Sequence, residues 1–246
     1  MAKKQGDETA VAVMDEPKTT ALVAPTDNRG MDGVEGLDDT AMPRLAVAQK
    51  TSPQLDPSKS DKYIDGLKLF QMFNSLTKHN YGNGPVKFQV IRTSKRAMQF
   101  DAQNNVVDFN VALDDPRCQF QTGPNGERVK PVATVFRDYL LWLPDTREVM
   151  ILSMKGTQHK VARDLNTLLM IGPKPIWATT YELRSASKQT GAYTTATFSV
   201  TPAGKATPED IAAAENWYDS TANFAERVDR RESSEAPSGD PSDIPF

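Results

Sequence analysis

The sequence predicts a mainly β protein of the β-rich α+β class, and three observations predict it. Apolar and polar residues alternate in several segments, as at Val86, Phe88 and Val90, and this period of two is typical of half-buried strands. Turn residues separate these segments, as in 144–147. One central segment changes to the helical period between two pairs of expected strands. This order of hairpin, helix and hairpin favours an elaborated barrel similar to an OB-fold, and it also fits a sandwich or an α+β sheet.

The elements follow in chain order from Met42, where we expect the ordered part to begin. Residues 51–62 are rich in Pro and Ser and predict a loop. Residues 63–81 have mixed apolar spacing, which suits a short strand and a turn of helix. A long loop is expected at 114–131, which contains Asp-Pro and Gly-Pro-Asn-Gly. The strands are expected at 86–90, 107–113, 132–143, 148–155, 176–184 and 192–200.

Two helices are predicted in the second half of the chain. Within 158–171 the apolar residues Val161, Leu165, Leu168 and Leu169 recur at helical spacing, and Gly-Pro ends the segment. Polar residues 185–191 are then expected to close a hairpin. The last helix begins after Thr207, a residue type that caps helices, with Pro at its first position and acids in its first turn.

Charge divides the chain into three regions. The net charge of −3 alone argues against a nucleic-acid partner. Residues 1–41 carry four basic and nine acidic side chains and no aromatic ring, so we expect a disordered acidic arm. Residues 42–225 carry 22 basic and 17 acidic side chains, which predicts a mildly basic DNA-binding domain. Residues 226–246 carry three basic and six acidic side chains and are expected to form a disordered interaction tail.

The composition excludes several classes of protein. A single cysteine, Cys118, allows no intrachain disulfide and no Cys-rich zinc module. We find no apolar run long enough to cross a membrane and no signal peptide, so the chain is expected to be soluble and cytoplasmic. We find no catalytic or nucleotide-binding motif, and His79 and His159 stand alone. We therefore expect no enzyme, no cofactor and no metal.

Basic residues interleave with aromatic residues along the body, which favours single-stranded nucleic acid as a ligand. Cationic side chains follow the phosphates, and flat rings stack on splayed bases. Aromatic residues on alternating strands can equally well form the core, and the sequence leaves this alternative open. The DNA-binding candidates are Lys87, Arg92, Lys95, Arg96, Arg137, Tyr139, Trp142, Lys155, Lys160, Trp177, Tyr181, Arg184, Lys188 and Tyr193.

The most specific signal is the end of the tail. From Glu232 onward there are four acids and no base, and the chain ends in Asp243, Ile244, Pro245 and Phe246. This ending resembles the C-terminal tip of bacterial single-stranded DNA-binding proteins, and it is also similar to the design of phage-encoded ones. The resemblance covers only the tip, because the long basic body and the acidic N-terminal arm differ from the bacterial protein.

The resemblance implies a single-stranded DNA-binding protein of phage replication, recombination or repair that recruits partner proteins through Asp240, Asp243, Ile244, Pro245 and Phe246. Phe246 and Ile244 would fill an apolar pocket on the partner, and a basic rim would bind the acids. Two alternatives remain open. One is a recombination annealing or mediator protein; the other is a phage structural or host-interaction protein that docks through its tail without DNA. We also expect that the chain could form homo-oligomers.

Overall fold

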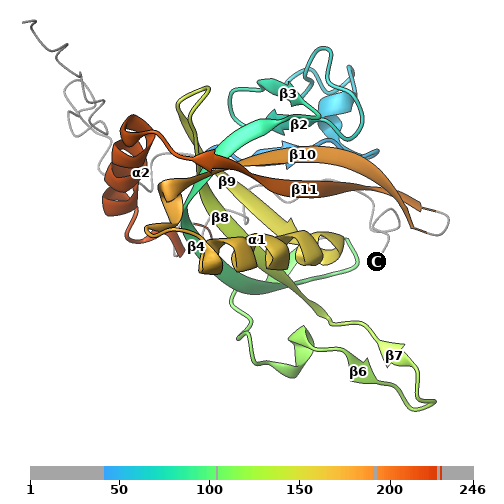
Figure 1. Cartoon of the computed structure of the whole chain (residues 1–246). Helices are drawn as coiled ribbons and strands as arrows, with labels where there is room; N and C mark the ends of the chain where they lie inside the picture. The colour runs from blue at the N-terminus through green and yellow to red at the C-terminus, as the bar shows by residue number, and fades with distance from the viewer. Residues whose placement is uncertain (1–41, 104, 191–192, 226–227, 229–246) are drawn as a thin grey trace, which may run out of the picture.

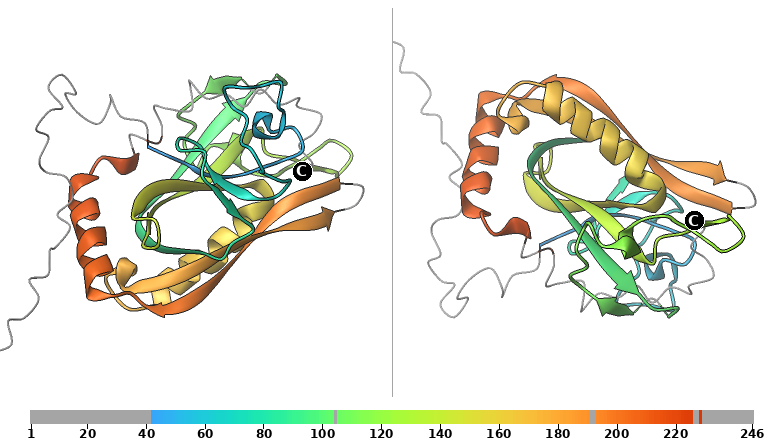
Figure 2. Two further views of the ribbon diagram at one scale, coloured as in Figure 1. Left: turned by 90° about the horizontal axis from the view of Figure 1, so that it is seen from above. Right: turned by 90° about the horizontal axis from the view of Figure 1, so that it is seen from below.

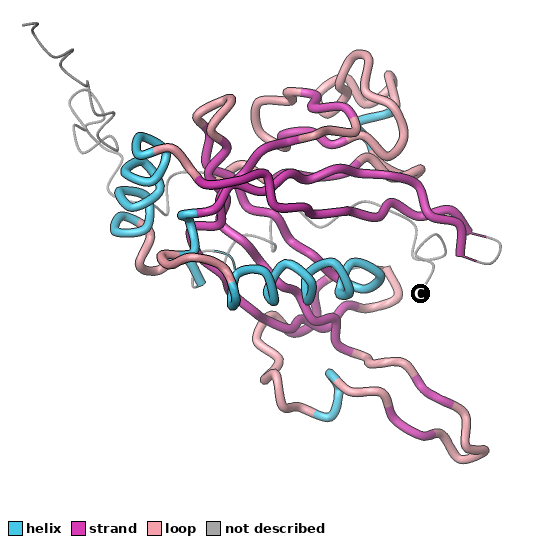
Figure 3. Tube along the Cα trace, viewed as in Figure 1, coloured by secondary structure: helices cyan, strands magenta, loops and turns pink. Residues whose placement is uncertain are grey.

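The computed structural model describes residues 42–103, 105–190, 193–225 and 228. These residues form antiparallel sheets with two helices (Figures 1 and 3), so the prediction of a mainly β, α+β protein is confirmed. The strands are Leu45–Val47 (β1), Met72–Asn74 (β2), Asn80–Gly82 (β3), Val86–Phe100 (β4), Val106–Asp108 (β5), Gln121–Thr122 (β6), Arg128–Val129 (β7), Ala133–Leu143 (β8), Glu148–Lys155 (β9), Thr179–Thr190 (β10) and Tyr193–Lys205 (β11). The helices are His159–Ile171 (α1) and Pro208–Ser220 (α2).

The largest sheet has the strand order β11-β10-β4-β8-β9, with β5 paired to β4. A second sheet contains β1, β2 and β3, and β6 pairs only with β7. The ladders of the described strands do not close into a barrel. The strands nevertheless curve strongly beside α1, as the views from above and below show (Figure 2).

Several predicted elements are confirmed. The segments 132–143 and 148–155 form the β8–β9 hairpin, and the helical period at 158–171 corresponds to α1. Gly172 ends α1, and its backbone N–H donates to the Leu168 carbonyl at 2.9 Å. Thr207 caps α2, because its hydroxyl accepts a hydrogen bond from the Asp210 N–H at 3.1 Å. This bond satisfies a donor that the first helical turn leaves open.

Other boundaries differ from the prediction. The polar segment predicted to close the second hairpin belongs largely to β10, which stays paired with β11 from Ser185–Phe198 to Thr190–Tyr193. The β-branched residues of the partner strand support this extension. The strand predicted at 86–90 continues to Phe100, whereas the one predicted at 107–113 is reduced to β5. In the segment 63–81 the structure has β2, β3 and turns, with no helical turn.

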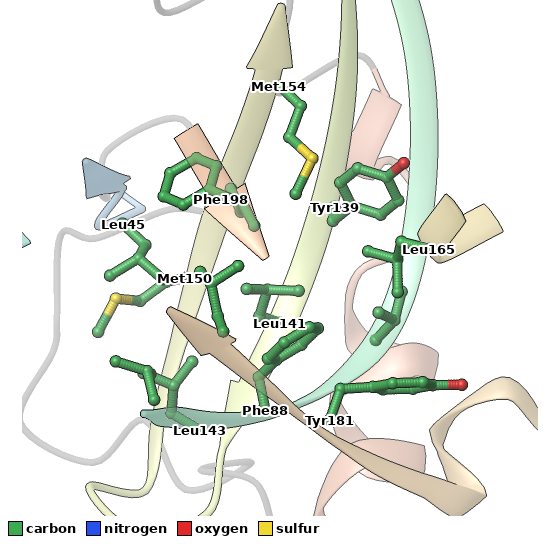
Figure 4. Packing of buried hydrophobic residues seen from close by; sticks show 14 of the residues in the cluster. Leu45, Phe88, Tyr139, Leu141, Leu143, Met150, Met154, Leu165, Tyr181 and Phe198 are labelled. Atoms are coloured by element: carbon green, nitrogen blue, oxygen red, sulfur yellow. The ribbon is translucent and has the colours of Figure 1, made fainter. Parts of the chain in front are cut away.

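The main core lies between α1 and one face of the large sheet, which we call the α1 face. Tyr139 and Leu141 of β8 and Phe88 of β4 point toward Leu165 of α1 (Figure 4). The Tyr139 side chain is buried. Its hydroxyl oxygen lies 3.0 Å from the Ala162 carbonyl oxygen and 2.9 Å from Asn166 Oδ1, and either oxygen can accept its hydrogen bond. Burial raises the Tyr139 pKa to about 12.

A smaller core lies on the opposite face of the sheet. Ala213 and Ala214 of α2 pack there in a cluster with Leu140, Trp142 and other buried residues of the sheet. The Trp142 indole N–H donates to Asp210 Oδ1 of α2 at 3.3 Å. Phe136 and Asp138 lie further along β8 on the same face and are also buried, but they do not belong to this cluster.

A β-bulge in β4 changes which residues face α1. Val90 pairs with Leu141, but Arg92 rather than Ile91 pairs with Leu140, so one extra residue is inserted. Before the bulge, even-numbered residues such as Val90 face α1; after it, Arg92 and the next even-numbered residues lie on the opposite face.

Candidate nucleic-acid interface

Cationic side chains gather on the face of the β4–β8–β9 sheet opposite α1. Arg96 of β4 pairs with Phe136 of β8, and Phe136 pairs with Lys155 of β9. Residues directly opposite one another on neighbouring strands project to the same side of a sheet. Two cations and one aromatic ring therefore form a row across three strands.

The side chains of this row are in contact. The Arg96 guanidinium carbon lies 4.6 Å from the centroid of the Phe136 ring. Lys155 Nζ lies 5.1 Å from the same centroid and 5.7 Å from that of Phe100, and the two rings are 6.1 Å apart. These distances are typical of cation–π attraction, so the rings hold the positive groups in place.

The next row fixes the orientation of Arg96. It contains Ser94, Asp138 and Ser153. The Arg96 Nε–H donates to Asp138 Oδ2 at 2.8 Å, and the two side chains are 5% and 0% exposed. The Ser153 hydroxyl donates to the other oxygen of Asp138 and accepts a hydrogen bond from Arg44 Nη1 at 3.2 Å. Asp138 thus has a partner for each oxygen, which a buried carboxylate requires.

Arg92 joins this face to the end of α2. Its Nη2 and Nε groups donate to the Tyr218 carbonyl at 2.6 and 3.2 Å. Its guanidinium carbon also lies 3.8 Å from the centroid of the Tyr218 ring. A cation near the C-terminal end of a helix hydrogen-bonds to the last carbonyls and interacts favourably with the helix dipole. Arg92 therefore has a structural role in addition to its charge.

We call these residues the cationic face. It comprises Arg44, Arg92, Arg96, Lys155, Phe100, Phe136 and Tyr218. Among the described residues, the carboxylate of Asp138 lies between Arg96 and Ser153 on this face. Lys155 is exposed, Tyr218 is 37% exposed and Phe100 is half-buried, so these three side chains reach the surface. Arg96 and Phe136 are 6% and 2% exposed and support the face from below.

The structure brings together only some of the predicted DNA-binding residues. Arg92, Arg96 and Lys155 share the cationic face. Lys95 and Arg137 pair on the opposite side of the sheet. The remaining predicted cations are exposed on β4, α1 and β10, and they are Lys87, Lys160, Arg184 and Lys188. The side chain of Tyr193 lies outside the described part of the structure.

Four predicted stacking residues are core residues. Tyr139 and Tyr181 are 1% and 2% exposed in the α1 core, and Trp142 and Trp177 are 7% and 8% exposed in the α2 core. In this conformation none of the four rings is accessible to a base, and we remove them from the set of stacking candidates. The alternation of their strands places them inward, which is the alternative that the sequence left open.

The residues that the sequence did not single out are Arg44, Phe120 and Tyr218. Tyr218 lies in the last turn of α2, and Phe120 is 53% exposed between Gly- and Pro-containing turns. An aromatic ring outside any alternating apolar pattern is a signal for exposure, and it could have identified Phe120. The tail residues Asp240, Asp243, Ile244, Pro245 and Phe246 lie outside the described residues, so the structure does not describe the predicted partner site.

Other kinds of site are not evident in the part of the chain that the structure describes. It contains no group of three or more His, Cys, Asp or Glu side chains that could hold a metal ion. None of the described helices is both long and apolar enough to cross a bilayer.

Comparison with known proteins identifies a family. A family model described as Pam3 phage gp34-like protein matches residues 12–234. The chain therefore belongs to the Pam3 phage gp34-like family. Neither the curated proteins nor the solved structures contain a match.

Proposed function

We propose that this member of the Pam3 phage gp34-like family is a non-catalytic single-stranded DNA-binding protein that acts in phage DNA replication or recombination in the host cytoplasm. The observation that carries the proposal is the acidic tail with the sequence Asp243-Ile244-Pro245-Phe246. A phage family is the context in which this resemblance is expected.

The cationic face supports the proposal. Phosphate groups would contact the exposed Lys155 and the half-buried Arg44 and Arg92, and bases would stack on Phe100 and Tyr218. This combination of cations and rings suits single strands of any sequence, because every base has a flat face. A duplex keeps its bases stacked and offers only its phosphates, so we expect a preference for single-stranded DNA.

Two hydrogen bonds beyond the ladders support the proposal of an OB-like sheet, which would suit this ligand. Beyond its ladders, β9 is linked to the segment before β1 by the Ile151 N–H, which donates to the Pro43 carbonyl at 2.9 Å. The Ser185 N–H of β10 donates to the Asn83 carbonyl after β3 at 3.0 Å. We infer an open, OB-like curved sheet. At the two places where a closed barrel would have a ladder of hydrogen bonds between strands, this sheet has one backbone hydrogen bond each.

The tail would serve as the docking segment for replication or repair proteins. Ile244 and Phe246 would enter an apolar pocket of the partner, while Asp240 and Asp243 would contact basic residues around it. Pro245 restricts the backbone and lowers the entropy lost on binding.

Fluorescence anisotropy with labelled oligo-dT tests the DNA proposal. We expect binding at micromolar protein or below, an affinity that falls as salt rises, and weaker binding to a duplex of the same length. Absence of binding at micromolar protein would show that the proposal is wrong. Fast pairing of complementary strands by the bound protein would instead indicate an annealing protein.

Deletion of residues 240–246 tests the tail. Because an acidic segment tethered to a basic body competes with DNA at a high local concentration, the truncated protein should bind oligo-dT more tightly at low salt. The matched control replaces Asp240 and Asp243 with Asn and should reproduce most of the effect. Equal or weaker binding by both variants would contradict competition by the tail.

A further inference from the structure

A β-hairpin arm projects from the body between β5 and β8. Its strands β6 and β7 pair only with each other, through Gln121–Val129 and Thr122–Arg128. The arm extends away from the sheets and helices (Figures 1 and 3). Its tip is closed by the Gly123 N–H, which donates to the Glu127 carbonyl at 2.8 Å, and by Gly126, whose φ of +80° favours glycine.

The arm carries an aromatic ring with a cation over it. The Arg128 guanidinium carbon lies 3.7 Å from the centroid of the Phe120 ring. Arg128 is exposed and Phe120 is 53% exposed, whereas Phe136 on the cationic face is 2% exposed. Phe120 therefore contributes much less to a core than Phe136 does, and more than half of its surface remains in contact with water.

The charges of the arm favour an anionic ligand. Arg128 and Lys130 are its cations, and Glu127 is its only acid between residues 119 and 131. The Glu127 carboxylate accepts a hydrogen bond from the Asn125 N–H at 3.0 Å, so it is engaged in closing the turn. A phosphate next to Arg128 would meet a net positive charge beside a flat ring.

The arm begins and ends near the cationic face. It leads directly into β8, whose first residue, Ala133, pairs with Gln99 of β4. Gln99 is followed by Phe100, and Phe136 lies three residues into β8. A DNA strand bound along Arg92 and Lys155 would therefore leave the sheet at the base of the arm.

We propose that Phe120 and Arg128 form a second binding site for single-stranded DNA, in which a base stacks on the Phe120 ring and Arg128 binds the adjacent phosphate. The site rests on the proposed function and extends it, because it lies on the arm and not on the sheet. Through this site the arm would hold the DNA strand where it leaves the cationic face.

Binding of oligo-dT by arm variants tests this site. Because a base stacked on an aromatic ring loses that contact on alanine substitution, Phe120→Ala should weaken binding by about tenfold while Phe120→Tyr retains it. Arg128→Gln should make the dependence of log K on log salt shallower by about 0.7. Gln121→Ala, on the same arm, is the control and should bind as the unmodified protein does.

Photocross-linking locates the contact directly. Oligo-dT that contains 5-iodouracil should cross-link to a peptide that includes Phe120, and the yield should fall in Phe120→Ala. If the unmodified protein binds oligo-dT but Phe120→Ala binds equally well without loss of the cross-link, the arm site is wrong and the proposed function stands. If the unmodified protein does not bind, both proposals are wrong. A change of mass by light scattering in Phe120→Ala at unchanged DNA affinity would make Phe120 a contact between copies and would overturn the arm site.

Discussion

The two faces of the β4–β8–β9 sheet use aromatic residues in different ways. On the α1 face, Tyr139 and Phe88 are buried among aliphatic side chains under a helix. On the other face, beyond the α2 core, Phe100 and Phe136 lie against the cations Arg96 and Lys155. The difference shows that the layer packed against a sheet decides whether its rings form a core or position charge.

The largest expected effect comes from the ion pair that supports the cationic face. Asp138→Ala leaves the buried Arg96 guanidinium without its carboxylate, and such a loss costs about 3–5 kcal/mol of the free energy of unfolding. Urea denaturation followed by Trp fluorescence measures it. Ser153→Ala, which removes one hydrogen bond to the same carboxylate, is the control and should cost about 1 kcal/mol. Equal losses in the two variants would show that the ion pair is not the main support.

A smaller effect is expected on the α1 face. Tyr139→Phe removes the hydroxyl that contacts the Ala162 carbonyl and Asn166 but keeps the ring, so the free energy of unfolding should fall by about 1 kcal/mol. Because this face is covered, the affinity for oligo-dT should stay unchanged. Weaker DNA binding by a fully folded Tyr139→Phe would contradict the assignment of this face to the core.

The smallest effect on stability is expected at Lys155. Substitution of this residue should change the affinity for DNA and not the free energy of unfolding. Lys155→Gln changes an exposed side chain and should alter the free energy of unfolding by less than about 0.5 kcal/mol. It should weaken oligo-dT binding and make the salt dependence shallower by about 0.7. Lys62→Gln, in an exposed loop outside the cationic face, is the matched control. If both variants bind equally well, the cationic face does not contact DNA.

Much of the fold could be predicted from local patterns. The β8–β9 hairpin, α1 and the Thr207 cap follow from alternation, helical period and capping chemistry, each of which acts within a few residues. The long pairing of β10 with β11 was missed because polar residues 185–190 owe their strand conformation to the partner strand. Tertiary pairing of this kind is invisible to a local pattern.

The candidate site was less predictable than the fold. The sequence identified Arg92, Arg96 and Lys155, but strict alternation from Phe88 and Val90 would place both arginines in the α1 core. The position of the bulge depends on how β4 pairs with β8, and no residue type marks it. The indole rings of Trp142 and Trp177 were equally ambiguous, because only the packing of α2 shows that they are covered.

The bulge at Ile91 decides which face of the sheet the charged residues in the second half of β4 occupy, and it depends on a single inserted residue. A deletion there would restore the regular alternation and invert everything beyond it, so that Arg92 and Arg96 would turn toward α1 and the neighbouring residues would turn outward. Substitutions at the cationic face can change its charge by one unit at a time. A change of strand length at this point would remove the β4 residues Arg92, Arg96 and Phe100 from the face together, so β4 should tolerate replacements far better than insertions or deletions.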